Sequence, residues 1–529
     1  MCFGIHFSPA QTVRQPVKQQ DSITQMLAQA TSLLAGAQTG ENYTRIKTIL
    51  SKVLTAAPKN VEAHTLAGFV ADRENDLKTA EKHFAAAIRL QPESPETHNN
   101  YGAILTRLKR HNEAAKEFEI SLKLNPNQPS AQANLAQIHF ERGKPADLQA
   151  ARTLFEKVFQ SAPDVEIARS LVIIALRLNE TERAARDFTA YAKLAENITL
   201  PNASRIELAS ALFERGLNAE AVYELEKAVA VDSSNVEAVI LLSRAYLKQK
   251  NIKSAGRTLE SALARGAADA RIYAALTDVY EAGGYYENAI PAMKIAIERD
   301  PRNEHYRFRY GMLLIETKAP PAAVIRLKEA VREFPRSARV WLGLGIAQYY
   351  DSKLNDAEQS LNRALELNPK LVLAVAYLAF IKNVGGQSEA ANSYYERALA
   401  IEEKNAVLHY LLADNLQKIA TSDVAVIEKH LRRAIELDAE LGGAYLALGR
   451  IYTRQKQFTE AAPLLEKTIQ LDPNRTEAYY QLAQVYARLK RADESRALLT
   501  KFKELSERDK NQTKTEYAEL LRRMANVRF

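Results

Sequence analysis

Residues Ala338 to Pro369 read ARVWLGLGIAQYYDSKLNDAEQSLNRALELNP, and this stretch decides the fold. Its first half repeats apolar residues every three or four positions, as at Leu344 and Ala347. Its second half does the same at Leu361 and Ala364. This spacing places the apolar side chains on one face of an α-helix. The short polar joint DSKLN separates the halves, so the stretch predicts two antiparallel helices joined by a tight turn.

The same pattern recurs every 34 residues along the chain. Val61–Pro92 and Pro95–Pro126 carry the small residues, the apolar residues and the closing proline at the same offsets. Two short insertions interrupt the period, near residues 143–147 and near residues 420–424. We count about fourteen units in Ser22–Phe502. The prolines that mark the phase are Pro58, Pro92, Pro126, Pro163, Pro301, Pro335, Pro369 and Pro473.

Small residues and prolines explain how each unit closes. Gly345 and Ala357 have little or no side chain, so we expect them to let the two helices of a unit approach closely. Pro369 ends the second helix because proline cannot continue the hydrogen-bond ladder. One helix pair cannot bury its apolar face alone, whereas stacked pairs can. The sequence therefore predicts an all-α solenoid over residues 22–502, a poorly ordered segment at 1–21, and a C-terminal capping helix and tail at 503–529.

These offsets resemble those of the tetratricopeptide repeat family, and the resemblance covers about nine tenths of the chain. It implies a right-handed α-solenoid of helix-turn-helix repeats that binds a protein or peptide in a concave groove formed by the first helix of each pair. The chain is also similar to the repeat arrays that recruit substrates for O-linked sugar transferases, because Asn100 and Asn134 occupy equivalent positions of consecutive repeats. That likeness stops after two asparagines.

The groove positions of residues 304–403 are apolar and often aromatic. Aromatic side chains offer a large contact area with few rotatable bonds, and they are frequent in protein interfaces. We therefore expect a peptide with apolar anchors to dock here, although some of these side chains, Tyr350 and Tyr377 first, suit packing between layers equally well. The candidate partner-binding residues are Phe308, Met312, Leu342, Ile346, Tyr349, Tyr350, Tyr377 and Phe380.

Further along the chain the same face becomes basic. The cations at these positions contrast with acidic residues upstream, Asp278, Glu281 and Glu316, and such a gradient would orient a partner. An ordinary solvated helix face explains the same residues. The arginines do not form the dense stripe that follows a phosphate backbone, so the sequence does not favour nucleic acid as the partner. The candidate basic groove consists of Lys418, Arg450, Arg454 and Arg488.

The motifs of common enzymes and metal sites are missing from the sequence. None of the nine histidines forms a His-Glu-x-x-His or Cys-His spacing, and neither a phosphate-binding loop nor a Gly-x-Ser-x-Gly elbow occurs. His64, His98 and His409 occupy the position that Trp341 holds in its own unit, so we interpret them as packing residues. We expect no catalytic residue, no metal and no cofactor.

Composition restricts the compartment only weakly. Hydrophobic residues make up 47% and charged residues 26% of the 529 residues, and 72 basic against 64 acidic side chains give a net charge of +8. Cys2 is the single cysteine, so no intramolecular disulfide is expected. The first twenty residues lack the apolar core of a signal peptide, and no apolar run is long enough to span a membrane. We expect a cytoplasmic protein, or an exported one if the true start lies upstream.

Together these observations predict a non-catalytic scaffold or adaptor that binds partner proteins along the groove, as bacterial repeat proteins do in assembling larger complexes. The alternative is a regulatory subunit that recruits substrates for a separate enzyme, such as a glycosyltransferase. Proteins of one fold serve unrelated roles, so the fold alone does not decide between the two.

Overall fold

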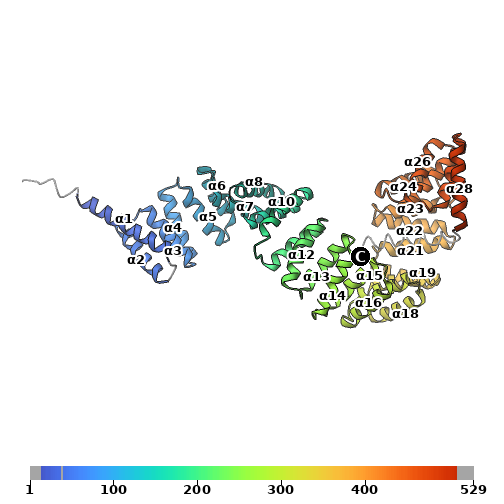
Figure 1. Cartoon of the computed structure of the whole chain (residues 1–529), viewed down its shortest axis with the longest axis horizontal. Helices are drawn as coiled ribbons and strands as arrows, with labels where there is room; N and C mark the ends of the chain where they lie inside the picture. The colour runs from blue at the N-terminus through green and yellow to red at the C-terminus, as the bar shows by residue number, and fades with distance from the viewer. Residues whose placement is uncertain (1–13, 37–39, 509–529) are drawn as a thin grey trace, which may run out of the picture. The chain divides into compact units, whose positions relative to one another are not determined.

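The computed structural model describes residues 14–36 and 40–508. Within these ranges the chain forms 28 α-helices and no β-strand, which is the number that fourteen two-helix units require. The predicted all-α repeat architecture is therefore confirmed. The chain divides into two compact units, Met1–Asn251 and Ile252–Phe529. Figure 1 colours the helices from blue to red in chain order.

The first unit consists of α1–α13. Odd-numbered helices are the first helices of the repeats and even-numbered helices are the second helices. Their bounds are α1 Arg14–Ala35, α2 Gly40–Ala56, α3 Val61–Arg73, α4 Leu77–Leu90, α5 Pro95–Arg107, α6 His111–Leu124, α7 Pro129–Arg142, α8 Pro145–Ser161, α9 Val165–Arg177, α10 Thr181–Ala195, α11 Asn202–Glu214, α12 Asn218–Val231 and α13 Val236–Lys248.

The second unit consists of α14–α28, in the same alternation. Its helices are α14 Ile252–Ala264, α15 Ala270–Ala282, α16 Tyr286–Arg299, α17 Glu304–Glu316, α18 Pro320–Glu333, α19 Ala338–Tyr350, α20 Leu354–Leu367, α21 Val372–Val384, α22 Ser388–Ile401, α23 Ala406–Leu416, α24 Val424–Leu437, α25 Gly442–Arg454, α26 Phe458–Leu471, α27 Thr476–Arg488 and α28 Ala492–Arg508.

Polar caps begin many of the first helices. Ser337 accepts a hydrogen bond from the amide of Val340 at the start of α19, and Asn60 accepts one from the amide of Ala63 at the start of α3. A side-chain oxygen at this place satisfies a backbone N–H that has no partner inside the helix. The proline ends one repeat, and the polar residue two positions later begins the next.

In twelve repeats the turn between the two helices contains one residue with left-handed backbone conformation. In the α19–α20 turn this residue is Ser352, with φ 59°, and the amide of Lys353 then donates to the carbonyl of Gln348 at 2.8 Å. Such a bond closes the end of a helix after a residue in this conformation. Equivalent residues recur through both units: Asn75, Lys109, Gly143, Asn179, Gly216, Lys250, Gly284, Lys318, Gly386, Lys456 and Lys490.

Close helix approach at the repeat glycine is confirmed. A Cβ atom on Gly345 would lie 2.7 Å from Cγ of Leu361, a side chain that is fully buried. The large residue sixteen positions after the glycine fills the space opposite it, while Ala357 is buried nearby. The same pairing joins Gly68 with Phe84, Gly102 with Phe118, Gly311 with Leu327, and Gly449 with Leu465.

The two insertions appear where the period predicted them. α8 has 17 residues where α6 has 14, so the extra residues near 143–147 lengthen a second helix. α23 ends at Leu416 and α24 starts at Val424, so the insertion near 420–424 lengthens a turn. Helix α1 begins at Arg14, inside the segment 1–21, whereas the predicted capping helix lies almost wholly outside the described residues. None of the described helices is long and apolar enough to cross a bilayer.

Candidate partner-binding surfaces

The fourth residue of a first helix ties that helix to the loop before it. Nε1 of Trp341 donates to the carbonyl of Pro335 at 3.0 Å. Nε2 of His64, His98 and His409 lies 3.0, 3.0 and 2.9 Å from the carbonyl oxygens of Pro58, Pro92 and Glu403. The predicted packing role of these three histidines is confirmed by this shared bond. No group of three or more metal-ligating side chains occurs within residues 14–36 and 40–508.

Two of these histidines face a second histidine. Nδ1 of His64 lies 3.1 Å from Nδ1 of His83, and Nδ1 of His409 lies 2.8 Å from Nδ1 of His430. The backbone carbonyl can only accept, so Nε2 of His409 carries a proton. In the neutral pair Nδ1 of His409 then accepts from Nδ1–H of His430. A second proton would set two N–H groups against each other, and burial already lowers the pKa of both His409 and His430.

Most of the predicted aromatic groove is buried. Five of its eight residues are at most 6% exposed, so they cannot contact a partner unless neighbouring helices move. The packing interpretation therefore describes these five, and the expectation that they line an open groove is corrected here. They are Phe308, Leu342, Ile346, Tyr377 and Phe380. Met312, Tyr349 and Tyr350 are partly exposed. Their role in partner binding remains a prediction.

Close packing between first helices explains this burial. A Cβ atom on Gly343 in α19 would lie 2.8 Å from Cδ2 of the Phe308 ring in α17. The missing side chain lets the ring pack closely against the neighbouring helix, where Phe308 is only 1% exposed. A Cβ atom on Gly443 in α25 would likewise lie 3.0 Å from the Tyr410 ring in α23. Contacts between neighbouring first helices therefore cover these rings, of which the sequence placed Phe308 in the groove.

An aromatic cluster lies between α19 and α21. The ring of Tyr349 packs edge-on against Tyr350, Tyr377 and Phe380, with centroid distances of 5.3, 5.8 and 5.5 Å. Edge-to-face pairs of this kind are favourable beyond the area that they bury. Burial, followed by the neighbouring Tyr350, raises the pKa of Tyr349 to about 12. The phenol of Tyr349 therefore stays neutral at physiological pH.

The basic set divides into two pairs of different character. Nζ of Lys418 lies 3.2 Å from both the Asp414 carboxylate and the Asn383 amide oxygen. Arg450 forms a 2.9 Å ion pair with Glu477. Arg454 and Arg488 are exposed, and neither forms a side-chain hydrogen bond or ion pair with the described residues.

The acidic end of the predicted gradient is partly neutralised. Arg309 in α17 lies 2.7 Å from the carboxylate of Asp278 and also pairs with Glu281, both in α15. Burial raises the pKa of Glu281 above its ordinary value of 4.5, although Arg309 acts in the opposite direction. One arginine thus compensates two carboxylates, and the acidic field that a partner would meet is weaker than the sequence indicates.

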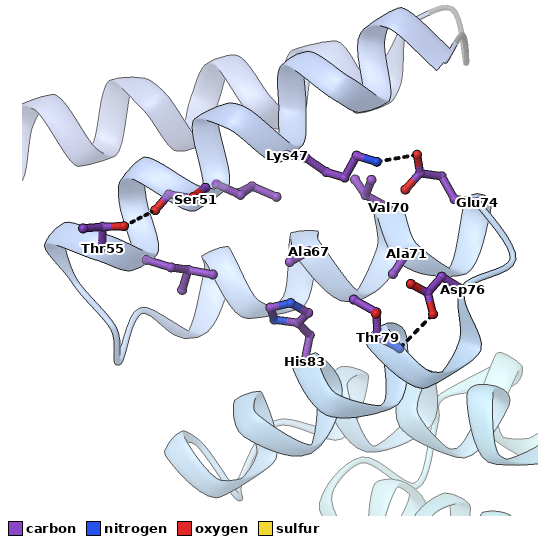
Figure 2. A pocket seen from close by; sticks show the side chains of 12 residues that line it. Lys47, Ser51, Thr55, Ala67, Val70, Ala71, Glu74, Asp76, Thr79 and His83 are labelled. Atoms are coloured by element: carbon purple, nitrogen blue, oxygen red, sulfur yellow. Dashed lines mark hydrogen bonds and ion pairs between the residues drawn. The ribbon is translucent and has the colours of Figure 1, made fainter.

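A cavity of about 450 Å³ lies between α2, α3 and α4, away from every predicted site (Figure 2). Apolar residues, among them Leu50 and Val70, form part of its wall. Lys47 and Glu74 form a 2.8 Å ion pair at one end, as Figure 2 shows. His83 also lines the cavity, and burial, followed by the nearby His64, lowers its pKa. The cavity suits an apolar side chain that carries a hydrogen-bonding group.

Comparison with known families decides the identity of the fold. Family profiles described as tetratricopeptide repeat match residues 65–129, 212–279, 270–303, 320–372 and 452–523, which together make up more than half of the chain. The chain belongs to the tetratricopeptide repeat family. Trp341, Gly345 and Ala357 are thus repeat-defining residues, and the 34-residue period is that of the family. The assignment supports a protein-interaction adaptor role.

Curated relatives of this tetratricopeptide repeat protein match only part of it. The type IV pilus assembly protein PilF of Pseudomonas aeruginosa is 28% identical over 165 residues, 30% of this chain and 64% of PilF. Human cilia- and flagella-associated protein 70 is 29% identical over 30% of this chain and 14% of its own length. Anaphase-promoting complex subunit 3 of Schizosaccharomyces pombe is 22% identical over 32% and 26%. The chain thus spans less than two thirds of each relative.

Solved structures are similar over most of the chain at low identity. Yeast Tom70 covers 88% of this chain and 96% of its own, with 16% identity and a TM-score of 0.39. The Cut9 and Hcn1 hetero-tetramer of the anaphase-promoting complex covers 88% and 95%, with 14% identity and a TM-score of 0.40.

Sequence reasoning missed three features of these repeats. The cavity leaves no pattern in the sequence, because its lining comes from three helices and carries ordinary packing residues. The Gly343–Phe308 contact was missed because it joins two repeats and not the two helices of one repeat. The pairing of Arg450 with Glu477 has a signal, since Arg450 lies in the second half of α25 and Glu477 in the first turn of α27, the next first helix. The sequence does not show which cations stay unpaired.

Proposed function

We propose that this chain is a non-catalytic scaffold that holds partner proteins together in a larger assembly. The observation that carries the proposal is the family match itself, which recurs in both units of the chain. Repeats of this kind present extended surfaces on stacked helices, and those surfaces suit protein partners. Two relatives are named as parts or builders of assemblies, a subunit of the anaphase-promoting complex and a pilus assembly protein.

Partners dock on three partly exposed side chains at the aromatic cluster: Met312, Tyr349 and Tyr350. We call these three residues the aromatic edge. The three side chains are partly exposed on α17 and α19 and rest on a buried aromatic layer. Their support is rigid, so a partner loses little by ordering them on binding. A neutral phenol offers both an apolar ring and a hydrogen-bonding hydroxyl, a combination frequent at interface hot spots.

Photo-crosslinking tests this docking edge. A benzophenone amino acid placed at Met312 or at Tyr350 should capture a discrete protein in living cells. The matched control is Ile325 on the second helix α18, which is 57% exposed in the same unit. Capture of the same proteins at all three positions, or of no protein at Met312 and Tyr350, would exclude these residues as the docking site.

The pilus relative supports a more specific role in assembling an envelope or secretion machine of a bacterium. In that case we expect the protein at the site where such a machine is built, either in the cytoplasm or exported to the envelope. Cell fractionation of the native protein decides this point. Co-fractionation of the captured partner with envelope components is expected, and a partner confined to the soluble cytoplasm contradicts the envelope role while leaving the scaffold role intact.

A further inference from the structure

Cations at the ends of first helices connect neighbouring repeats in much of the molecule. Arg107, the last residue of α5, bonds Asp72 and, at 2.7 Å, the amide oxygen of Asn75 in the preceding turn. Arg215 after α11 bonds Asn179 in the same way. Both asparagines are the left-handed residues of their turns. A cation at this place therefore reaches the turn of the repeat before it and donates a hydrogen bond to an acceptor there.

The last two repeats break this rule. Arg488 ends α27, but the left-handed residue of the preceding turn is Lys456, which offers no acceptor. Arg454 ends α25, and the turn of the repeat before it is the lengthened turn at 417–423. Lys490 is the left-handed residue of the next turn. All four side chains are exposed, and none has a hydrogen bond or ion pair with the described residues. We call Arg454, Lys456, Arg488 and Lys490 the C-terminal basic edge.

Exposed like charges in neighbouring turns do not stabilise the fold. The left-handed turn residue is an asparagine before Arg107 and before Arg215, but it is Lys456 before Arg488. The turn therefore offers Arg488 a second cation in place of an amide acceptor. Adjacent like charges raise the free energy of the free protein, and an anionic ligand lowers it. The four cations belong to turns one repeat apart, a separation of about 10 Å for packed helices.

We propose that the C-terminal basic edge binds an acidic segment of a partner protein. An extended peptide advances about 3.3 Å per residue, so carboxylates three residues apart match the two turns. The basic track is short, because Glu477 pairs with Arg450 and Glu494 pairs with Arg491 beside it. Nucleic-acid binding relies on neutralising many phosphates along a longer stripe. The inference extends the proposed scaffold role to a second surface, distinct from the aromatic edge.

Binding of a labelled synthetic peptide, Ser-Glu-Glu-Ser-Glu-Glu-Ser, to the full chain tests the proposal by fluorescence anisotropy. The variant is Arg454→Glu/Arg488→Glu. The matched control is Arg302→Glu/Arg336→Glu, which makes the same change of charge at two exposed arginines 34 residues apart in the α16–α17 and α18–α19 loops. Circular dichroism at increasing temperature verifies that both variants keep the fold.

We expect the first variant to bind the peptide about tenfold more weakly or worse, and the control to bind like wild type. Affinity of the wild type should fall with added salt, because the cations are exposed. Equal binding by both variants, equal loss in both, or no binding by wild type overturns the proposal. Preference for a single-stranded oligonucleotide or an anionic vesicle over the peptide also overturns it. Crosslinking at Tyr350 is unaffected by these outcomes, so the scaffold role is tested separately.

Discussion

Substitution of Gly345 by alanine tests how closely the two helices of one repeat pack at Leu361. The new Cβ atom would lie 2.7 Å from Cγ and 2.8 Å from Cδ2 of Leu361, and 3.3 Å from the carbonyl oxygen of Ala357. Leu361 is fully buried and cannot turn away into solvent. Overpacking of this kind costs about 1–3 kcal/mol, whereas alanine in place of glycine gains about 1 kcal/mol of helix propensity. We expect a net loss of about 1 kcal/mol.

Two comparisons separate the clash from the propensity. Gly256→Ala in α14 places its Cβ atom 3.5 Å from Val279, an ordinary contact, so this variant should gain stability of up to about 1 kcal/mol. In the background of Leu361→Ala, which alone costs about 2–5 kcal/mol, Gly345→Ala should no longer destabilise. The difference between the two backgrounds measures the clash.

The assay is urea unfolding followed by fluorescence. Trp341 is the single tryptophan and lies in the same helix as Gly345, so it reports on this repeat. Circular dichroism reports on all helices and serves for Gly256→Ala. A clash with Leu361 is refuted if Gly345→Ala raises the urea midpoint as Gly256→Ala does, or if the cost of Gly345→Ala is unchanged when Leu361 is alanine.

Three further predictions follow from burial, titration and turn geometry. Phe380→Ala should cost about 3–5 kcal/mol because the ring is 6% exposed, and thermal unfolding would show it; a melting temperature within a degree of wild type contradicts the burial. Lowered pKa values of His409 and His430 mean that the unfolded chain binds more protons, so their contribution is complete above pH 6.5 and declines as the pH falls through the folded values. His430→Gln should flatten the dependence of the melting temperature on pH between 7 and 5. Lys318→Gly relieves a left-handed backbone, φ 58°, and should stabilise by about 0.5–1 kcal/mol, whereas Lys328→Gly inside α18 should destabilise by about 1 kcal/mol; equal effects in urea unfolding would contradict the turn assignment.

Sequence periodicity was sufficient for the fold because each marker has a local cause. Gly345 marks the closest approach inside a helix pair, and Pro369 marks the end of the second helix. The left-handed turn residue recurs just as regularly, yet the sequence hides it, since serine, lysine, asparagine and glycine all occupy it. A conformation shared by different residue types leaves no compositional trace.

The candidate site was harder to predict because exposure depends on contacts between repeats. Position along a first helix placed Tyr349, Tyr350 and Phe308 alike in the candidate groove, yet the two tyrosines are partly exposed and the Phe308 ring is buried. The difference comes from Gly343 one repeat later, which lets the helices close over the ring. Pairing of charges depends on neighbouring repeats in the same way. Arg107 and Arg488 end equivalent helices, but Arg107 bonds Asp72 and Asn75 of the preceding repeat, whereas Arg488 has no such partner among the described residues.

Reconstitution of a complex from purified components tests the scaffold role most directly. A protein captured by crosslinking at Tyr350 is purified and titrated against the chain by calorimetry, beside Tyr350→Ala and Ile325→Ala. The scaffold account predicts stoichiometric binding that Tyr350→Ala weakens about tenfold, with Ile325→Ala and all melting temperatures unchanged. A captured protein that does not bind the purified chain, or that binds both variants as tightly as wild type, contradicts it.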